Sequence, residues 1–254
     1  MINVLEDDST KGSARALIDL PGPQNLVVSD WAASSAQGRQ RLHNEDSWGQ
    51  LGPIFVVSDG MGGLSNGAEA SAAAVAAMTR EWFDRELAAA EAVVRQVNAE
   101  VCIDLTGDER QGCTMTAIRV AHDQAMIVHV GDSRAYRIRD RRAELLTHDH
   151  NLRSELLAAG IVPGSTRAFG PLRALTSYLG RPDDELQIDL RSVSLRDGDR
   201  LVLCTDGVLD GQTHSEFVGR AGVGSTAEAV RRLTALGGAD DATAIAIDIG
   251  VDRD

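Results

Sequence analysis

The stretch IFVVSDGMGG, residues 54–63, has a close counterpart in LVLCTDGVLD, residues 201–210. In each, a continuous apolar run is followed by a hydroxyl residue, an aspartate and a glycine, so Asp59 and Asp206 occupy matching places. A short continuous apolar run predicts a strand buried on both faces. An aspartate where such a strand leaves the core is fixed by the sheet and still open to solvent. The repeat therefore predicts two rigidly held carboxylates at strand ends.

Other acidic residues stand at comparable places. Asp46 precedes a short strand, Asp132 lies between two strands, and Asp240 and Asp241 precede the last strand. Carboxylates that are brought together repel one another unless a cation lies between them. Mg²⁺ and Mn²⁺ prefer oxygen ligands of this kind. The alternative is an ordinary Asp-Gly turn, which is what we expect of RDGD at residues 196–199.

The rest of the chain predicts an α+β fold. Residues 114–121, 124–130 and 134–140 are β-rich runs joined by tight polar turns, which favours antiparallel pairing. The predicted helices come in blocks between groups of strands, and this argues against a doubly wound parallel sheet. Further helices are predicted over 67–87, 88–105, 151–160 and 226–238, and further strands over 54–58, 185–195, 199–204 and 242–250.

We predict one domain over residues 26–254, preceded by an N-terminal tail over 1–25. Residues 161–174 contain two prolines and two glycines without a clear period, which predicts a mobile loop.

Composition excludes several classes of protein. The 254 residues carry a formal charge of −13, which is unfavourable for general nucleic-acid binding because that relies on basic patches. The three cysteines are scattered without a CxxC pair, so we expect no zinc site and a reducing, cytoplasmic environment. No apolar run reaches membrane-spanning length, and the N-terminus does not resemble a secretory signal.

Seven motifs follow one another in the order RLHNEDS, VVSDGMGG, HVGDSRAY, LTHDH, LTSYLG, CTDGVLD and GGADDAT. Together they resemble the metal-dependent serine/threonine protein phosphatases, the protein phosphatase 2C family, in its bacterial form. The resemblance covers about residues 26–250. It implies a four-layer αββα sandwich of two antiparallel sheets flanked by helix pairs, with the metal centre at one edge. It also makes residues 161–174 the family's flap.

The resemblance also implies roles for individual residues. Asp59 is expected to bridge two Mn²⁺ or Mg²⁺ ions, and the carbonyl of Gly60 to contact the second ion. Asp206 and Asp240 are expected to hold the first ion. Glu45 and Asp46 are expected to orient metal-bound water, and Asp46 is also counted among the metal ligands. Asp132 is expected to bind a third, weaker ion, and Arg41 to bind the substrate phosphate.

Three positions depart from the family pattern. Met61 stands where many eukaryotic members have a histidine that protonates the leaving alcohol, although bacterial members commonly have Met there. Leu64 replaces a histidine that often follows the bacterial motif. Asp241 replaces the usual asparagine and adds a negative charge beside the last metal ligand.

The predicted activity is hydrolysis of phosphoserine and phosphothreonine in signalling proteins, by a monomeric enzyme that opposes a bacterial Ser/Thr kinase. Two alternatives stay open. The first is a phosphatase that acts on an anti-sigma-factor antagonist. The DDAT motif at residues 240–243 resembles the corresponding motif of that branch of the family. The second is a module that binds phosphoproteins without turnover. Such relatives usually lose metal aspartates, and none is lost here, so function must be decided at the site itself.

Overall fold

The computed structural model describes residues 25–62, 66–83, 85–104, 112–161, 172–235 and 238–252. Residues 1–24 of the predicted tail, residues 162–171 of the predicted flap, and Leu64 lie outside the described residues. Within the described ranges, no helix has both the length and the apolar character that a membrane span requires.

The apolar run that begins the first motif forms β3 (Ile54–Met61), an inner strand of the fold. Ile54 and Val56 pack against a pair of helices, whereas Phe55 and Val57 point the other way and pack against a second sheet. All four side chains are fully buried. Because both faces of the strand are covered, its sequence shows no alternation of polar and apolar residues. The predicted buried strand is confirmed.

β3 belongs to a six-stranded sheet in which all pairs are antiparallel. The helices α1 (Asn66–Glu81) and α2 (Ala90–Asp104) cover its outer face through Val75, Met78 and Val94. In spatial order the strands are β2 (Asp46–Leu51), β3, β5 (Met115–Ala121), β6 (Gln124–Val130) and β9 (Asp189–Ser194), with β4 (Gly112–Cys113) paired to the end of β3.

The second sheet has five antiparallel strands and contains the other apolar run, β10 (Arg200–Cys204). Its outer face is covered by α5 (His214–Ala221) and α6 (Thr226–Thr234), which contribute Phe217 and Leu233 to a separate core cluster. In spatial order the strands are β1 (Leu26–Ala36), β11 (Ala242–Val251), β10, β7 (Arg134–Arg139) and β8 (Arg142–Leu145).

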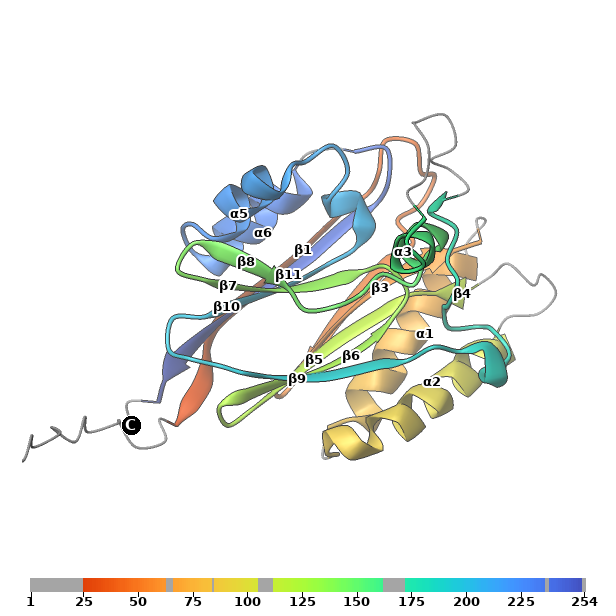
Figure 1. The fold of residues 1–254 in the computed structure, drawn as a ribbon, viewed down its shortest axis with the longest axis horizontal. Helices are drawn as coiled ribbons and strands as arrows, with labels where there is room; N and C mark the ends of the chain where they lie inside the picture. The colour runs from red at the N-terminus through yellow and green to blue at the C-terminus, as the bar shows by residue number, and fades with distance from the viewer. Residues whose placement is uncertain are drawn as a thin grey trace, which may run out of the picture.

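The two sheets are the inner layers and the two helix pairs are the outer layers (Figure 1). The predicted α+β class and the four-layer αββα arrangement are therefore confirmed. In the described part of the chain, further helical segments are α3 (Leu152–Ala158) and the 3₁₀ turns η1 (Leu87–Ala89), η2 (Asp183–Glu185) and η3 (Asp206–Val208).

Several short or edge elements were absent from the sequence prediction, among them β1, β4, β8 and α5. Strands β1 and β8 lie at the edges of their sheet, so their sequences are short or polar and lack a continuous apolar run. Helix α5 is also short, but Thr213 and Glu216 form a capping box at its start, a signal that could have revealed it. In addition, the predicted helix 67–87 ends early, at Glu81.

Candidate metal centre

Two of the predicted carboxylates face each other across neighbouring strands. Asp46 is the first residue of β2, and its register partner on β3 is Asp59. Residues paired directly in an antiparallel sheet have their Cβ atoms about 4.5–5.5 Å apart. The backbone of Asp59 is held by Thr114, whose Oγ1 accepts a hydrogen bond from the Asp59 amide at 2.9 Å. Sheet register therefore brings the first two acids together.

The second sheet contributes through the hydroxyl residue of its own Asp-Gly motif. Thr205 Oγ1 donates to Asp46 Oδ2 at 2.8 Å and accepts from the Thr243 amide at 2.9 Å. This contact joins the end of β10 to the start of β2 across the two sheets. The next residue, Asp206, begins η3, close enough to Asp59 for its charge to raise the pKa of the Asp59 carboxyl. The two Asp-Gly motifs thus converge at one edge of the sandwich.

Asp240 and Asp241, directly before β11, bind the segment that precedes β2. Arg41 Nε donates to Asp240 Oδ1 at 2.6 Å, and Arg41 also lies 3.2 Å from Glu45 Oε2. The buried carboxylate of Asp241 accepts the amides of Gly38 at 2.8 Å and Glu45 at 2.9 Å. Asp241 therefore fastens the loop that carries Arg41 and Glu45. Sequence reasoning left the role of this departure open.

Close backbone packing explains the glycines of both motifs. A Cβ on Gly60 would lie 2.2 Å from the Gly67 carbonyl oxygen, and one on Gly207 would lie 2.0 Å from the Asp241 carbonyl oxygen. Any larger residue would push these segments apart. The glycines allow the chain segments that carry the carboxylates to cross at the sheet edge.

Crowding raises the pKa of the central carboxyls. The pKa of Asp59 is well above its usual range because the group is removed from water and then because Asp46 and Asp206 lie nearby. Burial is also the main cause that raises the pKa of Asp46 to about 7, against the opposing hydrogen bond that Thr205 donates. Carboxylates that lie close together are hard to ionise because their negative charges repel one another. A cation bound between them would remove this repulsion, so the ionised carboxylates would hold it strongly.

Asp132 lies beside this group, in the turn between β6 and β7. Its pKa is raised to about 7, first by burial and then by the charge of Asp206. Two residues further on, Arg134 makes a two-pronged contact with Asp149, at 2.7 and 2.6 Å. Sequence reasoning singled out Asp132 but missed Arg134, although both lie within the HVGDSRAY motif.

The donor set fits a hard divalent cation. Asp46 Oδ1 is buried without a hydrogen-bond partner, whereas Oδ2 of the same carboxylate is bound by Thr205. An orphaned buried oxygen of this kind is suited to an ion or to a water that an ion holds. In the described part of the chain, however, no three His, Cys, Asp or Glu side chains surround a common point closely enough to hold an ion.

Two guanidinium groups lie close to the predicted ligands. Arg41 pairs with Asp240, and Arg173 lies 3.8 Å from Asp206 while it donates to Asp210 at 2.8 Å. The structure thus places Arg41 against a predicted metal ligand, and its role as the phosphate-gripping residue stays a prediction. So do the individual metal-ligand roles of Asp46, Asp59, Gly60, Asp132, Asp206 and Asp240, and the water-orienting role of Glu45.

Comparison with known proteins agrees with this architecture. The family model described as protein phosphatase 2C matches residues 35–239, so the chain belongs to that family. It is 32% identical, over 244 residues, to "Serine/threonine protein phosphatase PstP" of Mycobacterium tuberculosis. It is also 32% identical to "Serine/threonine phosphatase stp" of Listeria monocytogenes over 191 residues, which are 68% of this chain and 75% of that protein.

Solved structures show the same relationship. The catalytic domain of PstP, solved in complex with two manganese ions, superposes with a TM-score of 0.76 at 31% identity and covers 89% of this chain and 99% of that domain. PppA of Pseudomonas aeruginosa superposes with a TM-score of 0.76 at 27% identity, covering 89% of this chain. The PstP match includes 90% of this chain but only 46% of full-length PstP, so the chain spans about half the length of that relative.

Proposed function

We propose that this chain is a protein serine/threonine phosphatase that hydrolyses phosphoserine and phosphothreonine with the help of two Mn²⁺ or Mg²⁺ ions. One observation carries the proposal: the carboxyls of Asp46, Asp59 and Asp206 are gathered from two sheets at one edge, with a buried oxygen of Asp46 left unpartnered. PstP, quoted above, is named as a serine/threonine protein phosphatase, and the structure of its catalytic domain was solved with two manganese ions.

The residues that would hold the ions are Asp59 with the carbonyl of Gly60, Asp206, Asp240 and, through water, Asp46. When bound, the ions would activate a water for attack on phosphorus and neutralise charge on the phosphoryl oxygens. Thr205 keeps the Asp46 carboxylate in place by donating to Oδ2, which leaves Oδ1 free to face the ions or their water.

Arg41 is the residue best suited to hold the substrate phosphate. Its planar guanidinium can donate to two phosphoryl oxygens at once. It already lies at the carboxylate cluster, paired with Asp240 and Glu45, and its side chain is 35% exposed. To bind phosphate it would exchange the Asp240 contact for the substrate, which would leave that carboxylate available to an ion.

The substrates would be phosphorylated proteins, among them a Ser/Thr kinase that the enzyme opposes, and the protein would act as a monomer in the cytoplasm. Cys102, Cys113 and Cys204 are all unpaired, which suits a reducing compartment.

The test is phosphate release from a phosphothreonine peptide with Mn²⁺, by the wild type and by Asp206→Asn, with and without EDTA. We expect release that requires the metal and is lost in the variant. A folded wild type that releases no phosphate from several phosphopeptides in the presence of Mn²⁺ would overturn the proposal in favour of a binding module.

A further inference from the structure

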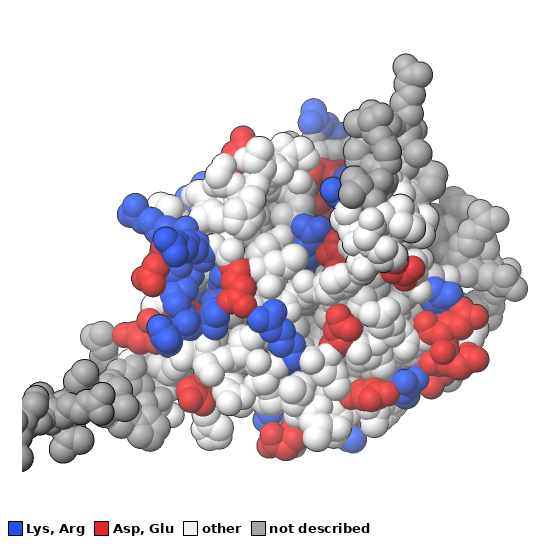
Figure 2. Space-filling view, viewed as in Figure 1, with Lys and Arg blue, Asp and Glu red and all other residues white. Residues whose placement is uncertain are grey.

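Many of the arginines in the described part of the chain are already paired with carboxylates. Figure 2 shows basic side chains gathered over β7 and β8. There, Arg137 contacts Glu144, and Arg139 makes a two-pronged contact with Asp199 at 2.6 Å. On the neighbouring β9, Arg191 also contacts Glu144, at 2.8 Å. These three guanidinium groups, Arg137, Arg139 and Arg191, offer little uncompensated charge to a partner.

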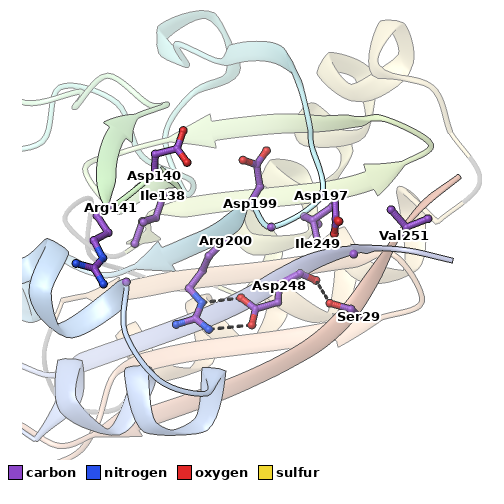
Figure 3. Close-up of a pocket in the computed structure, with 13 residues that line it drawn as sticks. Ser29, Ile138, Asp140, Arg141, Asp197, Asp199, Arg200, Asp248, Ile249 and Val251 are labelled. Atoms are coloured by element: carbon purple, nitrogen blue, oxygen red, sulfur yellow. Dashed lines mark hydrogen bonds and ion pairs between the residues drawn. The ribbon is translucent and has the colours of Figure 1, made fainter. Parts of the chain in front are cut away.

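A cavity of about 490 Å³ lies at the opposite end of the sandwich from the carboxylates, and its buried charged groups are also paired within the protein (Figure 3). Arg200 makes a two-pronged contact with Asp248 at 2.6 and 2.8 Å and also donates to the carbonyls of Ala221 and Gly224. Asp199 is bound by Arg139 and by the amide of Arg196. The buried charges of this cavity are satisfied within the protein, which identifies them as a structural network.

A second cavity, of about 320 Å³, opens directly beside the candidate metal centre. Its lining includes Asp132 and Asp206, which belong to the candidate metal centre, together with residues of α3. Three arginines line it: Arg134, Arg153 and Arg173. Its volume is at the small end of the range for ligand pockets and suits a side chain rather than a whole cofactor.

The charges in this cavity can be matched one by one. Arg134 is committed to Asp149, and Arg173 is committed to Asp210. Asp132 and Asp206 belong to the proposed metal centre. Arg153 is the remaining charge: it is exposed, and among the described residues its side chain makes no hydrogen bond or ion pair.

We propose that Arg153 determines substrate specificity by binding an acidic side chain, Asp or Glu, that lies near the phosphorylated residue of the protein substrate. The inference rests on the proposed phosphatase function. Arg41 contacts Asp240 of the carboxylate group, and the cavity adjoins Asp132 and Asp206 of the same group. A substrate whose phosphate lies at the metals can therefore extend into the cavity, where the free guanidinium meets it. An extended chain advances about 3.3 Å per residue, so a residue a few positions from the phosphate is within reach.

The test compares phosphothreonine peptides that differ only in one nearby residue, which is Glu, Gln or Lys, placed on either side of the phosphothreonine in turn. For the wild type, we expect kcat/KM to be about fivefold higher with Glu than with Gln, mainly through KM, as for one partly exposed ion pair. Arg153→Gln should remove this preference. Arg153→Glu should reverse it in favour of Lys, which the loss of a purely structural arginine would not do.

The matched control is Arg142→Glu, which reverses the charge of an exposed arginine at the far end of the β7–β8 hairpin. It should keep the wild-type ratio of Glu to Gln. The inference is overturned if the wild type does not distinguish the peptides at any position, or if Arg142→Glu changes the ratio as much as Arg153→Glu does.

A binding experiment separates this inference from the proposed function. The same peptides, with a non-hydrolysable phosphonate in place of the phosphate, are titrated into the wild type and the Arg153 variants by calorimetry. If no peptide is hydrolysed, the proposed function fails, and the Kd ratio of the Glu and Gln peptides still tests the role of Arg153. Equal Kd values in the wild type would overturn the inference even if hydrolysis is rapid.

Discussion

The substitution Asp241→Asn tests how the loop before β2 is fixed. Both carboxylate oxygens of Asp241 accept backbone amides, from Gly38 at 2.8 Å and from Glu45 at 2.9 Å, and the residue is only 3% exposed. An asparagine has one acceptor oxygen, and its NH₂ group would face the second amide. One buried N–H would then lose its partner, at a cost of about 1–3 kcal/mol.

The same substitution also has an effect that stabilises the folded protein. Removing the Asp241 charge relieves repulsion in the carboxylate group, since this charge helps to raise the pKa of Asp46. At physiological salt that benefit is reduced by screening and by the nearby guanidinium of Arg41. The lost hydrogen bond is direct and buried, so we expect it to dominate. A net loss of about 2 kcal/mol would lower Tm by about 4–8 °C for a protein of this size.

The assay is urea and thermal unfolding in EDTA at 0.15 M salt. The matched control is Asp123→Asn, an exposed aspartate for which we expect a change within about 0.5 kcal/mol. Because Asp241 fastens the loop of Arg41 and Glu45, kcat/KM should fall as well. An Asp241→Asn protein with wild-type stability and kcat/KM would refute this reasoning.

Three further predictions concern the site. Asp59→Asn and Asp206→Asn should each abolish Mn²⁺-dependent turnover and yet unfold at wild-type or higher urea concentration in EDTA, because each removes a repelled charge; a variant that stays active would contradict the metal assignment. In EDTA, the free energy of unfolding should fall as pH rises from about 4 to about 7, because Asp46 and Asp132 have a folded-state pKa of about 7 and keep their protons to higher pH in the folded state than in the unfolded state. Mn²⁺ should reverse this pH dependence in the same unfolding experiment. A free energy of unfolding that does not change with pH in EDTA would count against the raised pKa values. Arg41→Ala should reduce kcat/KM, whereas the Kd for Mn²⁺ measured by calorimetry should stay unchanged or decrease, because the substitution frees the Asp240 carboxylate. A large loss of Mn²⁺ affinity would show that Arg41 supports the ions instead.

The parts of the fold that the sequence predicted are those that burial imposes on it. β3 and β10 lie inside their sheets and are covered on both faces, so each appears as a continuous apolar run. The edge strands β1 and β8 are covered less completely and have mixed sequences, so no comparable signal exists.

At the site, the sequence identified the acids but not their partners. The order of motifs pointed to Asp59 and Asp206, and sheet register then explains why Asp46 joins them. The ion pair between Arg41 and Asp240 spans 199 positions of sequence. Such a contact depends on how two loops meet after both sheets have formed, and no local pattern in either loop reports it.

The central claim is that carboxylates delivered by two sheets hold two ions at one edge of the sandwich. The most direct measurement is an anomalous difference map from crystals grown with Mn²⁺ and recorded near the manganese absorption edge. The account predicts two adjacent peaks, both within ligand distance of Asp59, with Arg41 moved away from Asp240. A map without peaks at Asp59 and Asp206, with the Arg41–Asp240 pair intact at saturating Mn²⁺, would contradict it.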